Sequence, residues 1–158
     1  RVSAIAVVHE ILSQNFEEQV AFDEVADRIL HMVGDVAASS GSVVARREGS
    51  FGEVPAETAT ALSLATTELC QNAIEHSLDS SSGNVIVRSH RTDDALVVDI
   101  VSDGKPLPEG FSLDNHRSSL GLSIVTTLMQ DLGGTFTLED NSDRVGTCAR
   151  LVIPLQRL

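Results

Sequence analysis

The sequence contains no tryptophan or tyrosine, only two cysteines and a single lysine among its 158 residues. Two cysteines, Cys70 and Cys148, are too few for a disulfide framework, and their apolar neighbours predict buried free thiols in a reducing cytosol. No apolar run approaches the roughly 20 residues that a membrane span needs. Eleven basic residues stand against 23 acidic ones, for a formal net charge of −12. Because no cluster of basic side chains is available to neutralise phosphates, DNA and RNA are excluded as direct partners.

The residues that are present predict one folded domain with a helical segment before it. An apolar share of 42% excludes a disordered chain. There is no initiator methionine, and Arg1 begins on helix-like sequence, so we expect the chain to be part of a longer protein. Residues 1–37 are predicted to be what remains of a helical region and its linker, and residues 38–158 to form the main domain.

The spacing of apolar residues predicts the order of helices and strands. The four predicted helices cover residues 1–14, Asp23 to about Val33, Pro55 to about Leu78, and 119–132. Asp23 is predicted to cap the second helix, and Gly133-Gly134 to end the fourth with a left-handed cap. The five predicted strands cover residues 42–48, 85–90, 96–101, 135–139 and 146–154. Helices on one side and mostly hairpin-linked strands on the other predict a two-layer α/β sandwich, and the order argues against a Rossmann sheet.

The third predicted helix carries three polar residues at a spacing of four. Glu68, Asn72 and His76 would therefore project from one stripe beside the apolar face. The amide oxygen of Asn72 suits Mg²⁺, a hard cation that takes oxygen ligands and keeps several waters. Glu68, one turn earlier, could orient or polarise a nucleophile. For this helix taken alone, a solvated face with an incidental asparagine is the favoured interpretation.

Two further segments have a composition suited to nucleotide binding. The loop from Ser102 to Phe111 directly follows a strand, and an acidic side chain there could accept a hydrogen bond from an adenine amino group. The segment from Arg117 to Val125 is a small-residue turn that runs into a helix, where free N–H groups bind phosphate. It is neither a P-loop nor a G-x-G-x-x-G motif. Taken singly, an ordinary turn and a serine N-cap account for both.

Together the motifs resemble a known family. Glu-x-x-x-Asn on a helix, an Asp-Gly loop after a strand, Leu-Gly-Leu at a helix start and Gly-Thr before a terminal strand follow one another within residues 38–156. This order resembles the ATP-binding domain shared by sensor histidine kinases, type II topoisomerases and Hsp90-type chaperones. Residues 68–76 and 120–134 resemble the histidine kinases. Residues 1–27 are similar to the second dimerisation helix and linker of soluble, PdtaS-type kinases of actinobacteria.

The resemblance implies a Bergerat-type ATP-binding fold that uses ATP and Mg²⁺ and transfers the γ-phosphoryl group to a histidine upstream of this chain. It implies Asn72 as the Mg²⁺ ligand and Glu68 as the residue that orients or deprotonates the attacking imidazole. It also implies a homodimer through the helical region, a response regulator as partner, a cytoplasmic location, and nucleotide binding without autophosphorylation by this chain alone. The other implied cofactor-binding residues are His76, Ser102, Asp103, Gly104, Lys105, Arg117, Ser119, Leu120, Gly121, Leu122 and Thr147.

One loop departs from the pattern of this family. The family's loop reads Asp-x-Gly-x-Gly, and here Ser102 stands at the aspartate and Pro106 at the last glycine. Either Asp103 reaches adenine from a shifted register, or Ser102 makes a weaker, neutral hydrogen bond. Two alternative functions follow: a degenerate nucleotide-sensing or protein-interaction module with weak or no ATP binding, and an anti-sigma-factor kinase, which would not carry residues 1–14.

Overall fold

The computed structural model describes residues 19–37, 43–78, 82–113, 120–141 and 145–155. The predicted helix over residues 1–14 lies outside this range. The described elements are β1 (Gln19–Ala21), α2 (Phe22–Ala37), β2 (Val43–Glu48), β3 (Glu53–Pro55), α3 (Ala56–Asn72), η1 (a π-helix, Ala73–Ser77), β4 (Gly83–Arg91), β5 (Ala95–Ser102), α4 (Leu120–Asp131), β6 (Thr135–Asp140) and β7 (Thr147–Pro154).

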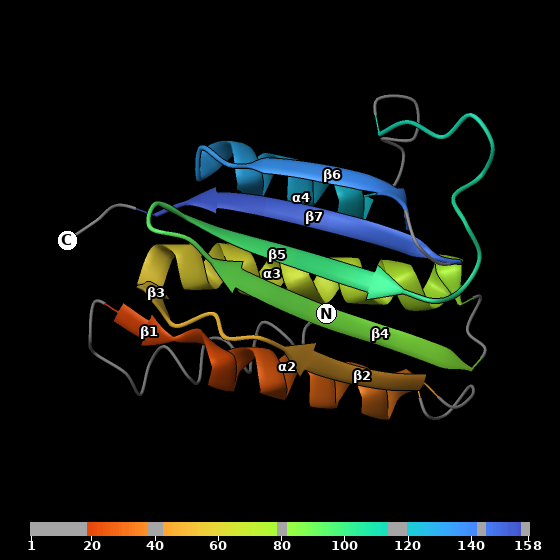
Figure 1. Cartoon of the computed structure of the whole chain (residues 1–158), viewed down its shortest axis with the longest axis horizontal. Helices are drawn as coiled ribbons and strands as arrows, with labels where there is room; N and C mark the ends of the chain where they lie inside the picture. Colours follow the sequence, from red (N-terminus) through yellow and green to blue (C-terminus); the bar gives the residue numbers. More distant parts are fainter. Residues whose placement is uncertain (1–18, 38–42, 79–81, 114–119, 142–144, 156–158) are drawn as a thin grey trace.

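The main sheet has five strands in the order β2-β4-β5-β7-β6, and the helices cover one of its faces (Figure 1). The pairs β4–β5, β5–β7 and β6–β7 are antiparallel, whereas β2 pairs with β4 in parallel. A parallel pair needs a crossover connection, and α3 with η1 provides it. The predicted two-layer α/β sandwich is therefore confirmed.

Two strand ends meet at one end of this sheet. β5 ends at Ser102 and β7 begins at Thr147, and these two residues are direct partners in the antiparallel register. The C-terminal end of α3 and η1 lies behind the same end of the sheet (Figure 1). The fold thus brings together three segments that the sequence separates.

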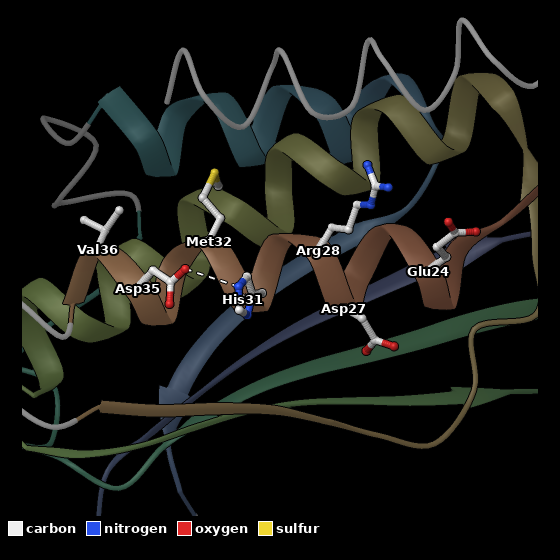
Figure 2. A pocket seen from close by; sticks show the side chains of 7 residues that line it. All are labelled: Glu24, Asp27, Arg28, His31, Met32, Asp35 and Val36. Atoms are coloured by element: carbon white, nitrogen blue, oxygen red, sulfur yellow. Dashed lines mark ion pairs between the residues drawn. The ribbon is translucent and has the colours of Figure 1, made fainter.

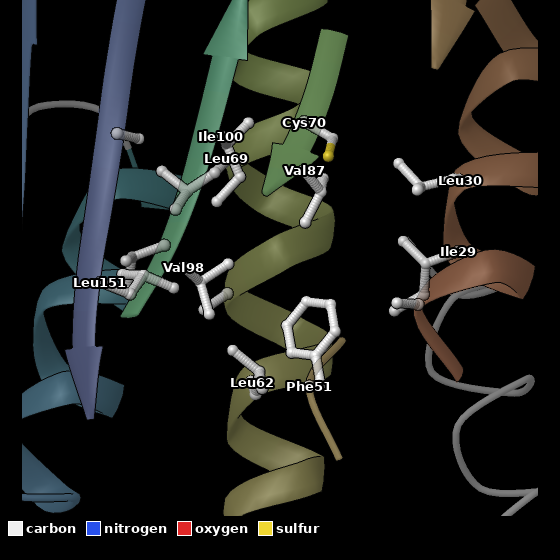
Figure 3. Close-up of a cluster of buried hydrophobic side chains, with 14 of the residues drawn as sticks. Ile29, Leu30, Phe51, Leu62, Leu69, Cys70, Val87, Val98, Ile100 and Leu151 are labelled. Carbon is white, nitrogen blue, oxygen red and sulfur yellow. The ribbon is translucent and has the colours of Figure 1, made fainter. Parts of the chain in front are cut away.

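The core lies between the helices and the inner face of the sheet (Figure 3). Phe51 is fully buried, and its ring centroid lies 4.9 Å from that of Phe22. Fully burying a side chain such as Ile29 or Leu62 contributes about 1.5–3 kcal/mol to folding. α2 supplies Ile29 to the same core as α3, and the predicted domain boundary at residue 37 stays a prediction.

Local details of the helices differ from the prediction in two places. Asp23 is not the N-cap of α2, because the helix begins at Phe22 and the Asp23 carboxylate instead accepts hydrogen bonds from Ser50 Oγ and Phe51 N–H, both at 2.7 Å. The helix predicted to run to Leu78 becomes a π-helix after Asn72. The predicted left-handed cap is confirmed, since Gly133 has a φ of 71° after α4.

Within the described residues, no helix is long and apolar enough to cross a membrane.

Candidate functional site

Glu68 and Asn72 occupy the last turns of α3, and both are half-buried at the edge of the core. Their spacing of four within one α-helix places them on one face, as the sequence predicts. The neighbours Leu69 and Cys70 are buried. The side chains of Glu68 and Asn72 therefore lie between the hydrophobic core and the protein surface.

Beyond Asn72 the predicted stripe enters a π-helix. The helix widens over Ala73–Ser77, where the Leu78 N–H donates to the Ala73 carbonyl at 2.9 Å. His76 lies within this π-helix, four positions after Asn72. His76 is exposed, and its part in binding a cofactor stays a prediction. π turns of this kind are frequent at functional sites.

A buried chain of hydroxyl groups links η1 to the two strand ends. Ser102 Oγ donates to Ser77 Oγ at 2.6 Å and lies 3.0 Å from Thr147 Oγ1. Ser77 Oγ in turn donates to the Lys105 carbonyl at 3.0 Å. Ser102 is 1% exposed, and Ser77 and Thr147 are 6% exposed. The structure therefore brings the predicted Ser102 and Thr147 together, and adds Ser77, which the sequence does not single out.

Asp103 points away from this cluster. Its Oδ1 accepts the Asn84 backbone N–H at 2.8 Å, and its Oδ2 accepts the Asn84 side-chain amide at 2.7 Å. The shifted register, in which Asp103 would contact a base, therefore has no support in the geometry. Asp103 ties the loop to the start of β4, and the place of Ser102 at the family's aspartate stays a prediction.

The pKa of Asp103 is lower than its ordinary value. Partial burial raises the pKa, but the hydrogen bonds from the side chain and backbone of Asn84 together lower it by a larger amount. A carboxylate whose pKa is lower in the folded state stabilises the fold above its unfolded pKa, and that contribution is lost as the pH falls through the folded pKa. The affected window therefore lies below about pH 4.

Replacing Asn84 by alanine is expected to raise the pKa of Asp103 toward its ordinary value, because the side-chain donor to Oδ2 disappears. Carboxyl-carbon NMR titration of both proteins measures this shift directly. Carboxylates far from Asn84 serve as the internal control and should keep their titration midpoints. An unchanged midpoint for Asp103 would mean that Asn84 does not set its pKa.

Two glycines let the backbone approach this site closely. A Cβ at Gly104 would overlap the carbonyl oxygen of Ser77, and one at Gly146 would overlap that of Ser102. The loop is further tied down where the Lys105 N–H donates to the Ser77 carbonyl at 2.6 Å. The side chain of Lys105 is exposed. These contacts pack the loop after β5, η1 and the start of β7 tightly against one another.

The remaining predicted residues lie at the start of α4 or beyond the described part of the chain. Leu120 is exposed, Gly121 is half-buried and Leu122 is buried in the core. Arg117 and Ser119 fall outside the described residues. α4 begins at Leu120, so the predicted helix start for phosphate binding is present in the fold.

The donor set at this end of the sheet fits Mg²⁺ and a nucleotide. Mg²⁺ usually takes one or two protein oxygens and completes its shell with water and phosphate oxygens. The amide oxygen of Asn72 suits that role, and the described residues hold no group of three or more His, Cys, Asp or Glu side chains placed to bind a metal. The hydroxyls of Ser102 and Thr147 and the close approach allowed by Gly104 and Gly146 suit a flat polar ligand.

Both cysteines are free thiols. Burial raises the pKa of Cys70 to about 12. Burial, together with the neighbouring charge of Asp99, raises the pKa of the half-buried Cys148 to about 11. Each thiol therefore stays protonated at neutral pH, and neither is suited to act as a nucleophile.

Two surface concavities are lined by residues other than those of this site. One follows α2 and is lined by Arg28, Met32 and other side chains drawn in Figure 2. Its ion pair between His31 and Asp35, 3.3 Å apart, is largely exposed, so it contributes little to stability. The other lies on the outer face of the sheet, where Asp99 accepts two hydrogen bonds from Arg150, at 2.8 and 3.0 Å.

The chain is similar to known proteins both in sequence and in fold. Residues 57–157 match the family described as histidine kinase-, DNA gyrase B- and HSP90-like ATPases. The chain is 44% identical over 160 residues to the sensor histidine kinase PdtaS of Mycobacterium tuberculosis, which covers 99% of this chain and 32% of the relative. Identity to the PdtaS protein of Mycolicibacterium smegmatis is 41% over the same length and coverage. The chain thus spans about a third of the length of these relatives.

The fold is shared with solved histidine kinase structures. The histidine kinase domain of a blue-light-activated kinase from Erythrobacter litoralis superimposes with a TM-score of 0.80 at 25% identity, covering 98% of this chain and 77% of that chain. The mycobacterial sensor histidine kinase MprB superimposes with a TM-score of 0.67 at 25% identity, covering 89% of this chain and 99% of that chain.

Proposed function

The chain belongs to the family of histidine kinase-, DNA gyrase B- and HSP90-like ATPases, and from this premise we propose that it is the ATP-binding catalytic part of a sensor histidine kinase. The proposal rests on one observation. Ser102 and Thr147 contact each other through their hydroxyl groups, and they lie beside the end of α3 that bears Glu68 and Asn72. The similarity to PdtaS proteins extends over nearly the whole chain and supports the same assignment.

In this proposal each element of the site contributes one part of phosphoryl transfer. When bound, Mg²⁺–ATP supplies the γ-phosphoryl group, and Asn72 would hold the cation through its amide oxygen. Glu68 would orient the attacking imidazole or accept its proton. Ser102 and Thr147 would bind the base, and the helix start at Leu120 would face the phosphates. The acceptor histidine is not among these residues.

The chain's strongly acidic composition, with a formal net charge of −12, fits a site that neutralises phosphate through a metal ion and backbone N–H groups. Phosphoryl transfer depends on positioning and charge neutralisation more than on covalent chemistry by the protein. The proposed partners are a second copy, bound through the helical region, and a response regulator that receives the phosphoryl group.

Titration calorimetry with Mg²⁺–ATP tests the nucleotide site. The chain is expected to bind one equivalent, and Asn72→Ala is expected to weaken that binding by about tenfold, the effect of losing one charge-assisted contact. Gln71→Ala is the matched control, because Gln71 is the neighbouring half-buried amide on the same helix.

Repeating both titrations with excess chelator separates two roles of Asn72. If Asn72 is the metal ligand, its substitution matters only when Mg²⁺ is present. An equal loss with and without the metal would instead place Asn72 against the nucleotide. Absence of any binding by the unaltered chain would favour the alternative of a degenerate module, which the comparisons do not favour.

A further inference from the structure

We infer that this site discriminates only weakly between adenine and guanine nucleotides, because its base-binding end presents neutral hydroxyl groups and no carboxylate. The inference rests on the proposed nucleotide site and concerns which purine it accepts. It follows from the direction of the hydrogen bonds among Ser77, Ser102 and Thr147.

The hydroxyl chain has a preferred direction. Each serine or threonine hydroxyl has a single hydrogen to donate. Ser77 donates its hydrogen to the Lys105 carbonyl, and Ser102 donates its own to Ser77. The contact of 3.0 Å between Ser102 and Thr147 can then be made only if Thr147 is the donor. Thr147 Oγ1, on a side chain that is 6% exposed, then keeps its lone pairs as neutral acceptors.

A neutral acceptor at this place suits adenine but excludes guanine only weakly. The 6-position of adenine is an amino donor, which the Thr147 lone pair can accept. The 6-position of guanine is a carbonyl acceptor, and Thr147 can turn its hydrogen toward that oxygen at the expense of its single bond to Ser102. The difference between the two bases is therefore about one neutral hydrogen bond, which corresponds to less than about tenfold in affinity.

The carboxylate of Asp103 does not change this weak preference for adenine over guanine. A carboxylate only accepts hydrogen bonds, so it would reject a guanine carbonyl far more strongly than a hydroxyl does. Both oxygens of Asp103 are engaged by Asn84 on the far side of the loop. The bonds between Ser77 and the Lys105 backbone hold the loop in that register.

The test compares the affinities of Mg²⁺ complexes of non-hydrolysable ATP and GTP analogues by titration calorimetry. For the unaltered chain we expect a preference for the adenine analogue of less than about tenfold. Ser102→Asp is expected to widen that preference by at least about tenfold, because it places an acceptor-only group at the base. Thr60→Asp adds the same charge at an exposed position near the other end of α3 and should leave the ratio unchanged.

Ser77→Ala provides a test that does not add a charge inside the fold. Without its link to the Lys105 carbonyl, Ser102 can turn its hydrogen toward Thr147, and Thr147 can donate to a base freely. The preference for adenine should therefore become smaller still. Comparing the adenine preference of Ser77→Ala with that of the unaltered chain tests the inference even if Ser102→Asp does not fold.

The outcomes separate this inference from the proposed function. An adenine preference well above about tenfold in the unaltered chain, or a wider preference in Ser77→Ala, overturns the inference while the nucleotide site stands. Binding of neither analogue overturns both the inference and the proposed function. A preference that is small, narrows in Ser77→Ala and widens in a folded Ser102→Asp supports the inference.

Discussion

Replacing Glu68 by glutamine is expected to slow phosphohistidine formation by about 100-fold or more while leaving the affinity for Mg²⁺–ATP unchanged. Glutamine has nearly the shape of glutamate but cannot accept a proton or carry a charge. Glu68 is half-buried one turn before Asn72, and in the proposed site its carboxylate would face the nucleophile. The loss should therefore appear in the rate at saturating nucleotide and not in the binding constant.

The measurement is a time course of phosphohistidine formation in a polypeptide that includes the acceptor histidine, with binding followed in parallel by calorimetry. Glu75→Gln is the matched control, because Glu75 is an exposed carboxylate on the adjoining η1. If the two variants slow the reaction to the same extent, Glu68 has no special role. If Glu68→Gln weakens nucleotide binding instead, its role lies in the binding site and not in proton transfer.

Much of the fold follows from local sequence patterns. The alternation of apolar residues in β7 and the helical spacing in α4 each reflect burial on one face, which depends only on neighbours in the sequence. The turn after α4 was predictable for the same reason, since Gly133 adopts a left-handed conformation that few other residues accept. The contact between Ser102 and Thr147 instead depends on the pairing of β5 with β7, which are not consecutive strands.

The details of the site depended on contacts that no local pattern reveals. Asn84 binds Asp103 across 19 positions and Ser77 binds Ser102 across 25. An asparagine before a strand and a serine near a helix end are both common, so neither stands out in the sequence. η1 likewise contacts the distant loop after β5, where Gly104 lies against Ser77.

Short strands were also missed, for a different reason. β1 and β3 have three residues each, which is too short to show an alternating pattern, and they pair with each other. The parallel pairing of β2 with β4 is a property of the crossover through α3, and strand composition alone does not predict it.

Gly146→Ala is expected to destabilise the fold by about 3 kcal/mol, the sum of backbone strain and a steric clash. Gly146 has a φ of +117°, a conformation that residues with a Cβ rarely adopt, and the new Cβ would overlap the Ser102 carbonyl oxygen. That oxygen also accepts the Asn141 side-chain amide at 2.9 Å. Relief of the clash must therefore move the end of β5 away from the start of β7.

Substitutions at two other glycines separate the effect of backbone strain from that of the steric clash. Gly110 has a φ of +76°, and no atom lies within 4 Å of the place that a Cβ would take, so Gly110→Ala should show the strain alone, about 1 kcal/mol. Gly34 lies within α2 with open space around it, and Gly34→Ala should be neutral or stabilise by up to about 1 kcal/mol. Denaturant midpoints of all three variants give the comparison.

The difference between Gly146→Ala and Gly110→Ala measures what close contact between the two strand ends contributes. We expect it to be about 2 kcal/mol, and we expect nucleotide affinity to fall only in Gly146→Ala at temperatures where both variants stay folded. Stability and nucleotide affinity would fall together because Gly146, which has no room for a Cβ, lies against the backbone of Ser102. Equal destabilisation by the two substitutions would show that β5 and β7 can separate at little cost, and Gly146 would then have no part in holding the hydroxyl chain together.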